Sequence, residues 1–165
     1  MIEFEPLRQA DLALVEEWLG REHVRRWWRD VIEESIAEYE RAIAGLDPSD
    51  HYLIVVDGRP VGMIETYLVS DHPDWEAIVK VGEGVAGVDL LIGEEELTGQ
   101  GLGPRVLERF AHEIVFSQPD THACVAAVDE ANRRSWRAFE TAGFRYVRDV
   151  EEDGRPHRLM RLERR

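Results

Sequence analysis

The chain has 165 residues, 33% of them charged and 44% hydrophobic, so it is long enough for one well-packed domain and too short for two. Asp and Glu number 34 against 20 Lys and Arg. The net charge of -14 argues against broad binding to nucleic acid and favours cationic partners. The start has no signal-peptide pattern, and no stretch is apolar enough to cross a membrane. We therefore expect a single cytoplasmic domain over residues 1–165, without membrane or nucleic-acid partners.

The first half of the chain predicts a strand, three helical regions and a hairpin. The strand covers residues 3–7, and the helical regions cover 11–19, 24–28 and 31–44. Two segments rich in β-branched and aromatic residues, 51–56 and 60–69, flank Asp57-Gly58, a dipeptide typical of tight hairpin turns. The polar segment around 70–76 contains Pro73 and is expected to be a loop.

The second half predicts alternating strands and helices. Strands are expected at 85–92, 122–128, 144–150 and 157–162, and helices at 103–116 and 131–142. Together with the first half, this order predicts an α/β fold, in which helices flank a twisted, mixed and mostly antiparallel sheet.

A glycine-rich turn, Gly99-Gln100-Gly101-Leu102-Gly103-Pro104, opens the helix at 103–116. Glycines let the backbone approach an anion closely, and the free N–H groups of a first helical turn supply donors, so a pyrophosphate fits there. Ordinary turns use glycines too. The turn is not a Walker motif, which ends in Gly-Lys-Ser/Thr, nor a Rossmann fingerprint, which follows the first strand.

Asp89 lies inside an otherwise apolar strand. A carboxylate in that setting costs stability unless it is paired or faces a cleft. It is therefore a candidate general base; the alternative is an Asp that bonds to the backbone near residues 84–87. Asp74 lies in a polar segment, where a solvated side chain is the ordinary expectation.

The sequence from the strand through the glycine turn to Asn132 and Ala142-Gly143-Phe144 resembles the GNAT acetyltransferases. The resemblance implies the GNAT fold and acetyl-CoA as acetyl donor. The implied cofactor-binding residues are Leu91, Ile92, Gly99, Gln100, Gly101, Leu102, Gly103, Pro104 and Asn132. The sequence departs from the family at Thr98, where a Gln or Arg is usual, and at Phe139, where many members have a proton-donating Tyr.

The segments 11–19, 23–28, 52–67, 74–75 and 87–89 resemble the aminoglycoside 6'-N-acetyltransferases. This resemblance implies a cationic aminoglycoside as acceptor, with Asp89 and Asp74 as catalytic carboxylates that bind the ammonium group and accept its proton. It also implies antibiotic resistance. The implied substrate-binding residues are Trp28, Glu65, Tyr67, Asp74, Asp89 and Asp153. Core packing of Trp28 and a plain hairpin turn at Asp153-Gly154 remain alternatives.

Other activities stay open. Leu90-Leu91-Ile92-Gly93 also resembles the acyltransferases that act on N-hydroxylysine in siderophore synthesis, although those usually carry a His in place of Asp89. A protein N-terminal acetyltransferase, or a non-catalytic module that binds acetyl-CoA or a drug, is a further alternative. The histidines have no metal-site spacing, so no metal is expected, and Cys124 is expected to be buried in a strand. Both a monomer and a homodimer are compatible with the sequence.

Overall fold

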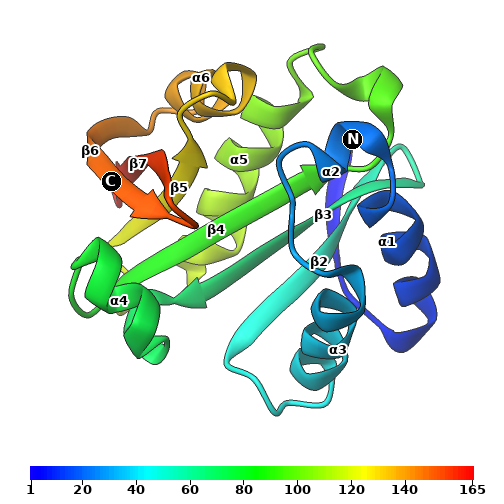
Figure 1. Ribbon diagram of the computed structural model, residues 1–165, viewed down its shortest axis with the longest axis horizontal. Helices are drawn as coiled ribbons and strands as arrows, with labels where there is room; N and C mark the ends of the chain where they lie inside the picture. Colours follow the sequence, from blue (N-terminus) through cyan, green and yellow to red (C-terminus); the bar gives the residue numbers. More distant parts are fainter. The chain divides into compact units, whose positions relative to one another are not determined.

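The computed structural model describes residues 1–165 and has seven strands in one mixed sheet, in the order β1-β2-β3-β4-β5-β7-β6 (Figure 1). The strands are β1 Ile2–Pro6, β2 Ser49–Val56, β3 Arg59–Leu68, β4 Val85–Ile92, β5 Ala123–Asp129, β6 Arg145–Glu152 and β7 Arg155–Glu163. Strands β4 and β5 pair in parallel, whereas β1 with β2, β5 with β7 and β6 with β7 pair antiparallel. The predicted α/β class and mixed sheet are confirmed.

Six α-helices complete the fold, and none is long and apolar enough to span a membrane. They are α1 Leu12–Leu19, α2 Glu22–Arg25, α3 Ile32–Ile43, α4 Pro73–Val79, α5 Leu102–Glu113 and α6 Arg133–Thr141.

The expectation of a loop around residues 70–76 is wrong. This segment forms a 3-10 turn, Val69–Asp71, followed by helix α4. Pro73 occupies the first turn of α4, where its fixed φ suits a helix and its missing N–H costs nothing. Asp74 and Glu76 also lie in that turn, where negative charge interacts favourably with the helix dipole.

Two hairpin turns have the predicted geometry. Asp57 and Gly58 connect β2 to β3 with φ values of 50° and 83°, and Asp153 and Gly154 connect β6 to β7 with 53° and 72°. Two consecutive positive φ values match the right-handed twist of the flanking strands. Both Asp-Gly pairs therefore have a sufficient structural reason to be present.

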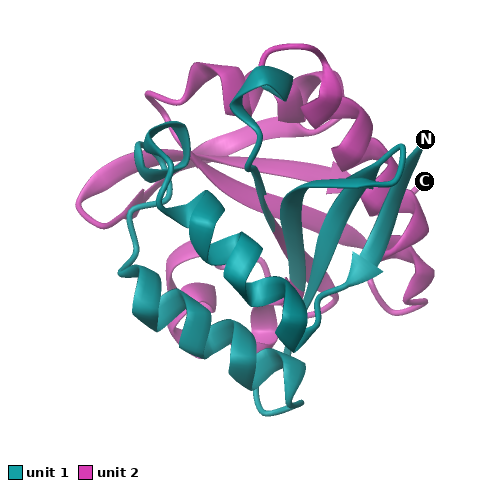
Figure 2. Cartoon of the chain, turned by 90° about the vertical axis from the view of Figure 1, so that its right-hand side faces the viewer, with its two compact units in different colours: residues 1–66, 89–98 teal, residues 67–88, 99–165 magenta.

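The chain divides into two compact units, one of residues 1–66 and 89–98 and the other of residues 67–88 and 99–165 (Figure 2). In the first unit, α1 and α3 lie together on one face of the strands (Figure 2). Their apolar side chains pack with Leu53, Met63 and Leu91 of the sheet into a buried core.

In the second unit, valines and alanines of β4 and β5 form the core together with β6 and β7. Cys124 is buried in β5, as predicted. Helices α5 and α6 pack against each other. Strand β4 contributes Val85–Val88 to this unit and residues 89–92 to the first.

Candidate functional site

The glycine turn at the start of α5 has the backbone that an anion site requires. Gly99 and Gly101 have φ values of 73° and 80°, a region that only glycine occupies without strain. Gly101 is the N-cap residue of α5, so the unpaired N–H groups of the first helical turn follow it directly. Gly103 lies against α6, since a Cβ there would be 3.5 Å from Ala138 Cβ.

The strand before the turn is only partly paired with β5. Val85, Ala86 and Gly87 pair with β5, and the pairing extends no further along β4. Leu91 is buried in the core of the first unit, and the Ile92 carbonyl oxygen lies 2.9 Å from His23 Nε2.

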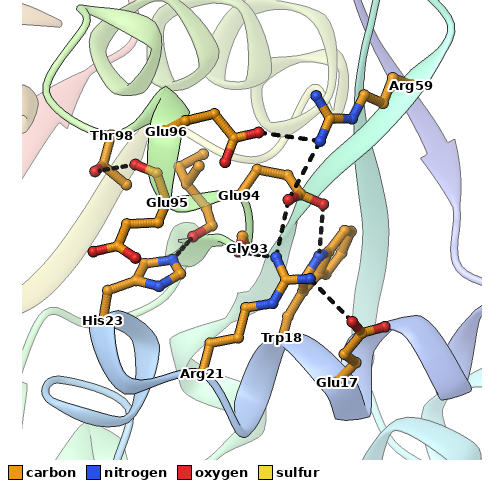
Figure 3. Close-up of polar contacts among 11 residues, drawn as sticks. Glu17, Trp18, Arg21, His23, Arg59, Gly93, Glu94, Glu95, Glu96 and Thr98 are labelled. Carbon is orange, nitrogen blue, oxygen red and sulfur yellow. Dashed lines mark hydrogen bonds and ion pairs between the residues drawn. The ribbon is translucent and has the colours of Figure 1, made fainter.

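Arg21 fixes the backbone where β4 ends (Figure 3). Its guanidinium donates hydrogen bonds to the Gly93 carbonyl at 2.8 Å and to the Glu94 carboxylate at 2.9 Å. Glu94 also accepts a hydrogen bond from Trp18 Nε1 at 3.4 Å and lies 3.4 Å from Arg59. The hydrogen bond from Arg21 lowers the pKa of Glu94, so this carboxylate stays charged and the approach to the glycine turn is held in place.

Trp28 and Glu65, two of the predicted substrate-binding residues, belong to one group of polar and aromatic side chains. His51 Nε2 is 2.7 Å from Glu65 Oε2, and these side chains are 1% and 14% exposed. The His51 ring centroid lies 4.8 Å from that of Tyr39, whose hydroxyl accepts a hydrogen bond from Trp28. We call Trp28, Glu38, Tyr39, His51 and Glu65 the Glu65 cluster.

The pKa values of two members of the Glu65 cluster are raised. Burial raises the pKa of Glu38, and the nearby charge of Glu65 raises it further. Burial also raises the pKa of Tyr39, again with a contribution from Glu65. A bound ammonium group would offset the repulsion that the Glu65 charge exerts on the Glu38 carboxylate.

Asp89 shares a sheet face with Glu65. Successive side chains of a strand alternate between faces, so Glu65 lies on the same face as Met63, and Asp89 on the same face as Leu91. Met63 and Leu91 both pack into the core beneath α1 and α3. This face of the first unit therefore carries both carboxylates, and Asp89 is half-buried.

The candidates in the second unit lie in different surroundings. Asp74 is exposed in the first turn of α4. Tyr67 packs so closely on Gly87 that a Cβ there would overlap its ring, and its centroid is 4.9 Å from that of His72. His72 Nε2 is buried and has no hydrogen-bond partner.

Three further residues from the sequence analysis have evident structural roles. Asn132 is the N-cap of α6, and its side chain accepts a hydrogen bond from the Ser135 amide at 3.4 Å. Asp153 is exposed at the β6–β7 turn. Phe139 is buried, with its ring centroid 5.0 Å from that of Phe144, and it provides no proton donor.

The sequence alone did not identify Arg21, Glu38, His51 or His72. Arg21 is far along the chain from Gly93, and only the packing of α1 against the sheet brings the two together. His51 lies in β2 and Glu65 in β3, and their contact became evident only from the folded structure. No group of three or more His, Cys, Asp or Glu is arranged to hold a metal ion.

A partly paired central strand followed by a glycine turn and a helix suits a protein that binds a phosphorylated cofactor. The family model described as "Acetyltransferase (GNAT) domain" matches residues 8–152. The chain therefore belongs to the GNAT acetyltransferases, and acetyl-CoA is its acetyl donor.

Two relatives and one solved structure show which acetyltransferases this chain is similar to. The aminoglycoside N(6')-acetyltransferase type 1 of Klebsiella pneumoniae is 27% identical over 145 residues, covering 84% of this chain and 71% of that protein. The N(6)-hydroxylysine O-acetyltransferase of Escherichia coli is 25% identical over 163 residues, covering 93% and 48% respectively. The crystal structure of AAC(6')-Ib with coenzyme A and kanamycin has a TM-score of 0.87 at 27% identity, covering 99% of this chain and 95% of that one.

Replacing Gly101 by Ala is expected to raise the KM for acetyl-CoA. The space around Gly101 is open, so the new methyl group meets nothing, but φ of 80° disfavours any residue with a Cβ. A cost of about 1–2 kcal/mol shifts the turn, which corresponds to roughly a five- to thirtyfold increase. Steady-state kinetics with varied acetyl-CoA measures this change in KM. Gly45→Ala is the matched control, since Gly45 also has an open site and a φ of 77°. Equal KM values in both variants would contradict the placement of the cofactor.

Proposed function

We propose that the protein acetylates the 6'-amine of aminoglycoside antibiotics and so confers resistance to them. The observation that carries the proposal is the pair of carboxylates, Glu65 and Asp89, on one sheet face of the first unit, with Glu38 and Trp28 nearby. An aminoglycoside is a polycation with sugar rings, so carboxylates match its ammonium groups and aromatic faces match its rings. Similarity to an aminoglycoside N(6')-acetyltransferase over 84% of the chain supports the same acceptor.

Asp89 is assigned as general base. The acceptor amine arrives protonated, and it attacks only after a proton has passed to Asp89, directly or through a water molecule. The amine nitrogen then bonds to the acetyl carbon as the thioester C–S bond breaks. The sulfur leaves with the electron pair, and the nitrogen gives up its second proton to water to become the neutral amide. Because Phe139 has no acidic proton, the thiolate is protonated by water. Asp74, in the second unit, is kept as a candidate carboxylate for the ammonium groups of the acceptor.

The cofactor is assigned to the glycine turn and the end of β4. The amides of residues 100–103 bind the pyrophosphate, and the backbone of Leu91 and Ile92 pairs with the pantetheine arm, which Asn132 also contacts. Trp28 in the first unit, and Tyr67 and Asp153 in the second, are each kept as candidates for contact with a sugar ring of the acceptor. Residues 1–165 act as one domain in this proposal, because β4 contributes to both compact units.

A second candidate is O-acetylation of an N-hydroxylysine. The similarity to the Escherichia coli hydroxylysine O-acetyltransferase covers 93% of this chain and favours it. Two observations count against it. Asp89 stands where the sequence pattern of that group usually has His, and the Glu65 cluster offers a polycation more anionic partners than a single hydroxylated lysine needs.

The assay that separates these candidates follows free thiol release from acetyl-CoA with kanamycin, tobramycin, gentamicin or N-hydroxylysine. The proposal predicts turnover with the aminoglycosides that carry a free 6'-amine and none with N-hydroxylysine. If N-hydroxylysine were turned over and no aminoglycoside were, the proposed acceptor would be wrong and N-hydroxylysine would take its place. Binding of an aminoglycoside without thiol release would indicate a module that sequesters the drug.

A further inference from the structure

One arginine on α6 lies beside the glycine turn. A Cβ placed on Gly99 would be 3.5 Å from both Cζ and Nη2 of Arg134, so the guanidinium is in van der Waals reach of the turn. Arg134 lies one helical turn before Ala138, whose Cβ faces Gly103 in the same way. The face of α6 that packs on the start of α5 therefore presents Arg134 to the turn.

Arg134 is uncommitted, unlike its neighbours on α6. It takes part in no hydrogen bond, ion pair or ring contact, and its side chain is exposed. Arg133 and Arg137 both lie over the Trp136 ring, with Cζ at 6.0 Å and 5.8 Å from its centroid. A free guanidinium is notable in a chain with 34 acidic residues, where partners are plentiful.

The turn itself supplies no cation. Residues 99–104 contain only Gly, Gln, Leu and Pro, so backbone N–H groups are its only fixed donors apart from the Gln100 amide. A molecule of net charge -14 repels a polyanionic cofactor at long range, and a local positive charge offsets that repulsion where the phosphates bind.

We propose that Arg134 is a cofactor-binding residue that donates charge-assisted hydrogen bonds to the diphosphate of coenzyme A in the glycine turn. This inference rests on the assignment of the cofactor to that turn in the proposed function. Arginine suits the role because its planar fork of donors matches two phosphate oxygens at once.

The test measures the dissociation constants of CoA and 3'-dephospho-CoA by calorimetry for the wild-type protein, Arg134→Gln, Arg134→Lys and Arg137→Gln. Arg134→Gln is expected to weaken both ligands about tenfold, the loss of one charged hydrogen bond at an exposed site. Arg134→Lys keeps the charge but lacks the planar fork of donors, so its dissociation constants are expected to lie between those of the wild type and Arg134→Gln. Arg137→Gln removes the same charge from the same helix and stays within about twofold of wild type.

Two outcomes overturn the inference. One is equal affinity in Arg134→Gln and Arg137→Gln. The other is a weakening seen with CoA alone, which would assign Arg134 to the 3'-phosphate. Equal melting temperatures of the unliganded variants exclude misfolding as the cause. These measurements contain no acceptor, so they would give the same affinities even if the proposed acceptor were wrong. If the wild-type protein bound neither CoA nor 3'-dephospho-CoA, the assignment of the cofactor to the glycine turn would be wrong as well.

Discussion

Asp89→Asn is expected to lower kcat for acetylation of a protonated amine by about a hundred- to ten-thousand-fold, the usual contribution of a positioned proton acceptor. Asn keeps the size and polarity of the side chain at this half-buried position in β4, but its amide cannot take up the proton. Thiol release measured from neutral to alkaline pH tests the role. The deficit should shrink as the pH rises, because the free amine then becomes abundant without a base.

Asp120→Asn is the control for that substitution, since Asp120 is exposed in the segment before β5 and the same charge is lost. A deficit of equal size in both variants would show that the overall negative charge, and not Asp89 itself, supports the reaction. A deficit in Asp89→Asn that stays constant with pH would assign Asp89 to acceptor binding instead of proton transfer.

Trp18→Ala is expected to lower the free energy of unfolding by about 3–5 kcal/mol, the range for emptying a large aromatic site in a core. Trp18 is 0% exposed, and its ring covers Gly93 so closely that a Cβ there would overlap it. In a protein of this size such a loss lowers Tm by roughly 10 °C. Thermal and urea unfolding of the two proteins measure the change.

The matched substitution is Trp27→Ala, at a tryptophan that is only half-buried. It removes the same number of atoms but leaves a smaller cavity, so the loss of stability should be well below that of Trp18→Ala. Similar unfolding curves for the two variants would contradict the central position of Trp18. The KM for acetyl-CoA should rise only in Trp18→Ala, because its cavity lies at the approach to the glycine turn.

Local chemistry made most of the fold predictable. The strand of residues 85–92 was bounded correctly by its apolar composition, and both Asp-Gly pairs specified their hairpins through positive φ. Helix α4 was missed because its residues, taken one by one, are typical of a loop, and only the N-terminal position of Pro73 makes them compatible with a helix.

The site was less predictable, because its contacts depend on tertiary packing. The glycine turn was evident from spacing alone, since its residues are consecutive. The hairpin of residues 51–69 was predicted, but the contact between His51 and Glu65 within it was not. The bond from Arg21 to Gly93 joins segments that the chain pattern does not connect. The position of Arg134 could not be predicted for the same reason, because nothing in the sequence places α6 beside the glycine turn.

The position of the new acetyl group tests the central claim most directly. Kanamycin and acetyl-CoA would be incubated with the protein, and the product would be examined by mass spectrometry and NMR. The account predicts one acetyl group, on the 6'-nitrogen. Unmodified kanamycin, or an acetyl group on a hydroxyl oxygen, would contradict the assignment of this GNAT acetyltransferase to the aminoglycoside 6'-amine.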